Sequence, residues 1–219
     1  DLLAYWFGPI ERVSALVKTY EAELPAADGG RIQVTSEDTC FARIELAGGV
    51  VANVTMTMAG HGAEVGRRLV VGAAGSLSSD IWEAWQGGRM VLDDGASTPL
   101  GRLTAEYVEG LDPELRERLL PDGTFDPGDL SLDVADPVRY GVATSIADFA
   151  RAALEGGRPE VGGEEALAAL AGAIALLESS AADRTVAVAD VLSGENDLWQ
   201  AEMDRDLGLD SASDEKENR

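Results

Sequence analysis

The chain has 219 residues, of which 45% are hydrophobic, enough apolar side chain for one substantial core, or for one domain with a small appendage. Its 40 acidic and 17 basic residues give a formal net charge of -23, and such a field disfavours nucleic acid and anionic membrane surfaces as partners. No uninterrupted apolar run of about 18 residues occurs, so we expect no membrane span.

The rare residue types limit the chemistry further. Cys40 is the single cysteine and His61 the single histidine, so an internal disulfide is impossible and a zinc site of the usual ligands lacks donors. No secretory leader is expected at Asp1, and we expect a cytoplasmic protein. The excess of Asp and Glu over Lys suits a salt-rich cytoplasm or, equally, an acidic protein from a high-GC genome.

The first elements are predicted from apolar spacing. Residues 1–7 are typical of the last turns of a helix, which Gly8 and Pro9 end. Residues 10–20 alternate between apolar and polar side chains, which predicts a strand. Residues 21–33, with a proline and an Asp-Gly-Gly sequence, are expected to form a loop.

The clearest pattern is a hairpin over residues 38–59. Its first strand alternates apolar and polar residues, Gly48 and Gly49 turn the chain, and the return strand alternates again. One face is apolar and the other rich in threonine. Shorter strands are predicted at residues 67–71, 76–78 and 89–92.

Helices dominate the second half. A short helix is expected after Asp112, within an otherwise irregular stretch over residues 100–136. Asp136 is predicted to cap a helix with Val142, Ile146, Phe149 and Ala153 on one stripe. A second helix follows residues 164–165, with Leu167, Leu170, Ala171, Ile174 and Leu177 as its core face. Residues 185–188 are expected to form a last short strand.

Strands that precede helices, without alternation, predict an α+β fold: an open, mainly antiparallel sheet with helices packed on one face. We assign residues 1–193 to this domain. Residues 194–219 are expected to form an acidic helix that leads into a disordered tail.

The motifs that usually identify an enzyme are incomplete. Residues 70–75 lack the third glycine of a dinucleotide fingerprint and are better interpreted as a hairpin turn. His61 lies between glycines after the threonine-faced strand, where it is either an exposed loop residue or an acid or base near neutral pH. Arg67 and Arg68 are expected to form surface ion pairs, or one of the two to bind a substrate hydroxyl or carboxylate.

Several segments, taken in order, resemble the Gfo/Idh/MocA oxidoreductases, the group of glucose–fructose oxidoreductase and inositol dehydrogenase. The segments are Asp1-Leu2-Leu3 with Trp6 to Val13, Glu37-Asp38 with the turn at residues 46–50, residues 68–77, residues 149–167, and residues 178–186. Together they span residues 1 to about 190 and are similar to the C-terminal half of that family.

The resemblance implies a two-domain enzyme that transfers hydride between a nicotinamide cofactor and a sugar, polyol or cyclitol hydroxyl. NAD or NADP would be bound mainly by an N-terminal Rossmann domain that this chain lacks. The family's acid–base lysine and histidine would lie upstream, and Asp1 would be the last residue of its H-x-x-D motif. This half would bind substrate and form dimers or tetramers through its open sheet face.

On this interpretation the substrate side is lined by His61, Arg67, Arg68 and Tyr140, and Asp1 holds the upstream histidine. The chain alone is expected to be inactive. The alternative is a standalone, non-catalytic module that pairs through its threonine-rich sheet face. A hydrolase that uses scattered carboxylates has no spacing that singles out a pair.

Overall fold

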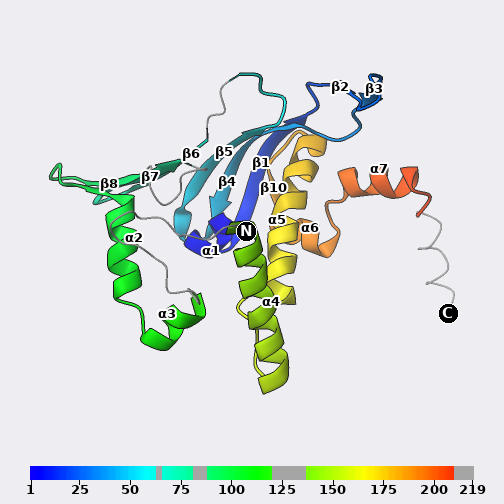
Figure 1. Cartoon of the computed structure of the whole chain (residues 1–219). Helices are drawn as coiled ribbons and strands as arrows, with labels where there is room; N and C mark the ends of the chain where they lie inside the picture. Colours follow the sequence, from blue (N-terminus) through cyan, green and yellow to red (C-terminus); the bar gives the residue numbers. More distant parts are fainter. Residues whose placement is uncertain (63–65, 81–87, 120–136, 210–219) are drawn as a thin grey trace. The chain divides into compact units, whose positions relative to one another are not determined.

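The computed structural model describes residues 1–62, 66–80, 88–119 and 137–209 (Figure 1). Its contacts divide the chain into two compact units. The first unit comprises residues 1–61 and 161–219, and the second comprises residues 62–160.

The first unit is built on a four-stranded antiparallel sheet in the order β10-β1-β4-β5. β1 (Ile10–Lys18) pairs along its length with β4 (Thr39–Leu46), and β4 pairs with β5 (Val51–Thr57) across the 3-10 turn η1 (Ala47–Gly49). Gly48 and Gly49 have φ of 77° and 82°, a conformation that glycine adopts without strain. The predicted hairpin and its turn are confirmed.

Helices cover one face of this sheet. Val13 and Ile44, which are register partners, lie on the covered face and are 0% and 5% exposed. Against them pack α5 (Gly163–Ala182), α6 (Val188–Ser193) and α1 (Leu2–Phe7) (Figure 1). The predicted α+β class, an open antiparallel sheet with helices on one face, is therefore confirmed.

The helix α5 contacts the sheet through small side chains. Its buried positions are Ala171, Gly172, Ala175, Glu178 and Ser179. The predicted core stripe was partly wrong, because Leu167 and Leu170 are 56% and 58% exposed. A Cβ on Gly172 would lie 2.9 Å from Cδ1 of Ile10, so a larger residue at this position would have to displace the end of the Ile10 side chain.

Two hydroxyl groups of α5 satisfy the free edge of β1. β10 (Val186–Ala187) pairs only with Arg12 and Val13, which leaves the following part of that edge without a strand. The Ser179 Oγ accepts the N–H of Ala15 at 2.9 Å, and the Ser180 Oγ accepts the N–H of Val17 at 2.9 Å. Side-chain hydroxyl groups thus accept the N–H groups of Ala15 and Val17, which a longer β10 would otherwise have bonded.

Residues 21–33 were expected to form a loop, and this was wrong. They contain the hairpin β2 (Glu23–Pro25) and β3 (Arg31–Gln33). The Asp28 Oδ1 accepts the N–H of Gly30 at 2.9 Å, and Gly29 has φ 84°. The Asp-Gly-Gly sequence is therefore a strand-to-strand turn.

The second unit contains an antiparallel sheet in the order β6-β7-β8-β9. Its strands are β6 (Arg67–Gly72), β7 (Gly75–Asp80), β8 (Arg89–Leu92) and β9 (Ser97–Pro99). The helix α2 (Leu100–Glu109) buries Ala105 and Val108 and was not predicted. The expected short helix is α3 (Pro113–Leu119); its neighbours at residues 120–136, including the proposed cap Asp136, lie outside the described residues.

The predicted helix after Asp136 is α4 (Pro137–Glu155). Its apolar stripe is not a core face, because Val142, Ile146 and Phe149 are 54%, 63% and 65% exposed. The last elements are α6 and α7 (Leu198–Asp206). α6 was not predicted, whereas α7 confirms the helix expected after Gly194; residues 210–219 lie outside the description.

One helix of the described chain, α5, is long and apolar enough to cross a membrane by length and composition, with a mean hydropathy of 1.4 over its best window. The expectation of no membrane span rested on the lack of an uninterrupted apolar run. In the structure, the small residues of α5 pack against β1.

Candidate functional site

The five predicted site residues fall in different parts of the fold. Asp1 and His61 belong to the first unit, and Arg67, Arg68 and Tyr140 belong to the second. Asp1 is exposed and precedes α1, where its carbonyl accepts the N–H of Tyr5. Arg67 and Arg68 are consecutive in β6, so their side chains point to opposite faces of that sheet. Tyr140 lies in the first turn of α4. The assignment of these residues to a substrate site remains a prediction.

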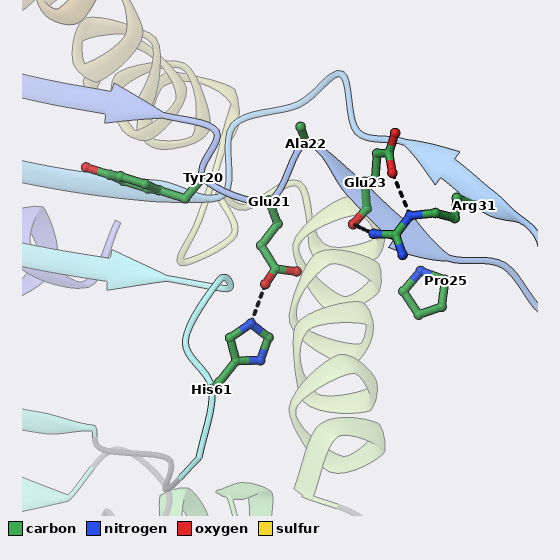
Figure 2. A pocket seen from close by; sticks show the side chains of 7 residues that line it. All are labelled: Tyr20, Glu21, Ala22, Glu23, Pro25, Arg31 and His61. Atoms are coloured by element: carbon green, nitrogen blue, oxygen red, sulfur yellow. Dashed lines mark hydrogen bonds and ion pairs between the residues drawn. The ribbon is translucent and has the colours of Figure 1, made fainter.

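His61 is the predicted residue with the clearest surroundings. It follows β5, and its Nε2 contacts Oε1 of Glu21, a residue just after β1 (Figure 2). The His61 side chain is 84% exposed, whereas that of Glu21 is 27% exposed. The carboxylate therefore fixes one ring nitrogen and leaves the rest of the imidazole open to solvent.

Asp38 holds the backbone on which Glu21 lies. Its Oδ2 accepts the N–H groups of Tyr20 and Glu21, both at 2.8 Å, and its Oδ1 accepts the Thr39 hydroxyl at 2.8 Å. The N–H of Glu21, aided by Thr39 and Tyr20, lowers the pKa of Asp38 against the opposing effect of desolvation. Hydrogen bonds to the charged form cause this direction. Asp38 is thus a support for the Glu21–His61 pair.

An open pocket of about 520 Å³ lies beside this pair and is lined by Tyr20, Glu21, Ala22, Glu23, Pro25, Arg31 and His61 (Figure 2). Arg31 donates from Nε to Oε2 of Glu23 at 2.6 Å. The wall thus presents an imidazole, a guanidinium and two carboxylates, whereas the Tyr20 ring points away from them (Figure 2). We call these residues the His61 pocket.

The His61 pocket can bind hydroxyl groups better than anions. Its two carboxylates accept hydrogen bonds, and its imidazole and guanidinium donate them. No group of three or more His, Cys, Asp or Glu residues arranged to hold a metal occurs in the part of the chain that the structure describes.

Sequence reasoning missed Glu21 and Asp38 as members of this network. Glu21 is separated from His61 by 40 positions, and the intervening pattern predicted a loop where the structure has β2 and β3. The Asp38 signal was present, because an aspartate just before a strand often accepts nearby backbone N–H groups.

Comparison with known proteins gives the family. The model of the oxidoreductase family, C-terminal alpha/beta domain, of the Gfo/Idh/MocA group, matches residues 1–188. The human and bovine proteins named glucose-fructose oxidoreductase domain-containing protein 2 are each 41% identical to this chain over 78 residues, which are 35% of this chain and 20% of theirs.

Solved structures share the fold. An oxidoreductase domain protein from Kribbella flavida aligns with a TM-score of 0.63 at 19% identity, over 86% of this chain and 47% of its own. Levoglucosan dehydrogenase in complex with NADH and L-sorbose aligns with a TM-score of 0.58 at 22% identity, over 86% of this chain and 47% of its own.

The chain belongs to the Gfo/Idh/MocA oxidoreductase family, as a C-terminal alpha/beta domain, since the match covers residues 1–188. It spans less than half the length of the solved structures that it resembles. The predicted family is confirmed.

Proposed function

We propose that this chain is the substrate-binding and assembly part of an NAD- or NADP-dependent oxidoreductase. The full-length protein would transfer hydride between the nicotinamide and a hydroxyl-bearing carbon of a sugar, polyol or cyclitol. The observation that carries the proposal is the family match over residues 1–188. A solved relative of the same fold binds NADH and L-sorbose, which supports the cofactor and substrate classes.

In this proposal the nicotinamide is bound mainly by an N-terminal domain outside this chain. The cofactor, when bound, supplies or accepts the hydride, and the protein contributes orientation and electrostatics. Asp1 would hold the acid–base histidine of the upstream part. On this basis the 219-residue chain by itself is inactive.

His61, Tyr140 and one of Arg67 and Arg68, whose side chains point to opposite faces of β6, would bind the substrate. The support for His61 is its exposed imidazole, anchored on one side by Glu21. A sugar offers hydroxyl groups that both donate and accept, and mixed polar walls like that of the His61 pocket suit such a ligand. These residues bind and orient substrate and carry out no chemical step.

Steady-state kinetics of the full-length enzyme would test these roles. With its preferred sugar or polyol, His61→Ala is expected to raise KM about tenfold with a smaller change in kcat, because a substrate hydrogen bond is lost. Arg102→Gln is the matched control, since Arg102 lies on α2 and pairs with Glu106 on the surface. An unchanged KM in His61→Ala would remove His61 from the substrate site, whereas a lack of any nicotinamide-dependent activity would contradict the proposed function.

We also propose that two copies associate through the open face of the β10-β1-β4-β5 sheet. This face exposes three large apolar side chains, Leu16, Phe41 and Val51, at 46%, 43% and 50%. They lie on adjacent strands, since Leu16 is the register partner of Phe41. An apolar group on an otherwise polar sheet is typical of a contact surface.

A further inference from the structure

Glu178 is a fully buried acid that the proposed function does not use. It lies in α5, is 0% exposed, and falls on the same buried stripe as Ala171 and Ala175. A buried carboxylate is costly unless hydrogen bonds compensate it. The hydrogen-bond partners of the Glu178 carboxylate therefore indicate its structural role.

All of the hydrogen-bond donors recorded for Glu178 come from one short segment. Its Oε2 accepts the Nδ2 of Asn196 and the N–H of Trp199, and its Oε1 accepts the N–H of Gln200, each at 3.1 Å. Trp199 and Gln200 are the second and third residues of α7, whose first N–H groups have no partner within the helix. Glu178 thus completes the N-terminus of a helix that is distant in sequence.

Asn196 links the carboxylate of Glu178 to the guanidinium of Arg184. The Asn196 side chain is 4% exposed, and its Oδ1 accepts the Nη2 of Arg184 at 2.6 Å. The N–H of Asn196 is donated to the Asp190 carbonyl in α6. The positive end of the α7 dipole also faces the carboxylate. We call Glu178, Asn196 and Arg184 the Glu178 anchor.

Apart from this anchor, α7 has no fully buried side chain. Trp199 and Ala201 are half-buried, whereas Leu198 and Met203 are 55% and 38% exposed. Its N-cap residue, Asp197, makes no side-chain cap bond. In Figure 1 the helix lies beside α5 and α6 at the C-terminal end of the described chain. Apolar burial in α7 is therefore limited to the half-buried Trp199 and Ala201.

We propose that α7 is a separable strap, held on α5 by the Glu178 anchor, that undocks as one unit while the sheet and α5 remain folded. The anchor is polar and directional, so loss of its carboxylate removes three bonds together. Segments with few buried apolar contacts open locally at a free energy below that of global unfolding. α7 begins beyond residue 188, where the family match ends.

Hydrogen–deuterium exchange of the 219-residue chain, followed by mass spectrometry, tests this proposal. Glu178→Gln keeps the size of the side chain but turns an amide NH₂ toward N–H donors. We expect exchange in residues 198–206 to quicken on the order of tenfold or more, because bonds to a charged acceptor are lost. Exchange in α5 and β1 should stay as in the wild type. Glu202→Gln, on the exposed side of α7, is the matched control and should change nothing.

A second variant keeps the buried carboxylate. Asn196→Ala removes one of the three donors and the link to Arg184, and it should speed exchange in α7 by a smaller factor than Glu178→Gln. Trypsin should cut after Arg205 faster in both variants than in the wild type. If α7 exchanges at the same rate in Glu178→Gln as in the wild type, the proposal is overturned. Parallel loss of protection in α7, α5 and β1 would also overturn it, because Glu178 would then stabilise the whole core.

Discussion

Single hydroxyl groups supply hydrogen bonds to the edge of β1 that has no neighbouring strand beyond Val13. The Ser179 Oγ accepts the N–H of Ala15 and donates to the carbonyl of Arg184 at 2.7 Å, and the side chain is 1% exposed. Ser179→Ala would leave the half-buried N–H of Ala15 without its acceptor. We expect a loss of about 1–3 kcal/mol in the free energy of unfolding, measured by urea denaturation. Ser14→Ala, on the exposed face of β1, should change it by less than about 0.5 kcal/mol; equal effects would contradict this reading.

A carboxylate next to the His61 pocket makes stability depend on pH. The N–H of Glu21 lowers the pKa of Asp38 in the folded chain below its ordinary value of 3.8. The carboxylate therefore stabilises the fold above that value, and this contribution is lost as the pH falls through the folded pKa. Asp38→Asn should be less stable than the wild type at neutral pH, and the difference should shrink in strong acid. Urea denaturation at both pH values measures it, with Asp206→Asn as control; a gap that widens in acid would refute the assignment.

Among the elements, β7 and β8 can pack closely only because the first residue of β7, Gly75, has no side chain. A Cβ on Gly75 would lie 2.3 Å from the Val91 carbonyl oxygen, and Gly75 has φ 155°. Gly75→Ala must therefore push β8 away, and we expect a loss of about 2 kcal/mol or more. Gly72→Ala is the control in the same hairpin, because its nearest neighbour would be 3.8 Å away. Equal losses of thermal stability in Gly75→Ala and Gly72→Ala would show that β7 and β8 do not pack as closely as the structure has them.

Alternation predicted the strands well where each strand has one buried face. β4 follows that pattern from Cys40 to Leu46 and β5 follows it from Val51 to Thr55, and the Gly-Gly turn between them was recognisable. β2 and β3 have three residues each, all exposed, so no apolar alternation could mark them. α4 shows the opposite error, since its apolar stripe predicted a core face that this chain leaves exposed at Val142, Ile146 and Phe149.

The candidate site was predicted only in part, for a physical reason. His61 was noticed because it is the single imidazole. Its partner Glu21 is one of 40 acidic residues, and only the pairing of β1 with β4, and of β4 with β5, brings the two together. Glu178 carried a signal that could have been used: it falls on the helical stripe of Ala171 and Ala175, where an acid must be buried.

For the whole molecule, charge and the open sheet face together predict how association responds to salt. Each copy carries a formal charge of -23, so two copies repel each other over about 10 Å at 0.1 M salt and over about 3 Å at 1 M. Association through Leu16, Phe41 and Val51 should therefore strengthen as salt rises. Analytical ultracentrifugation at low and high salt measures it, with Phe41→Glu expected to abolish it and Leu24→Glu, on β2, to leave it intact. Association that weakens with salt, or that survives Phe41→Glu, would exclude this interface.

We propose that this chain completes a nicotinamide-dependent oxidoreductase and binds no nicotinamide by itself. Calorimetric titration of NADH and NADPH into the 219-residue chain and into the full-length protein separates these two statements. We expect the full-length protein to bind one cofactor and the isolated chain to bind none. Tight binding by the isolated chain, or no binding by the full-length protein, would contradict the proposal.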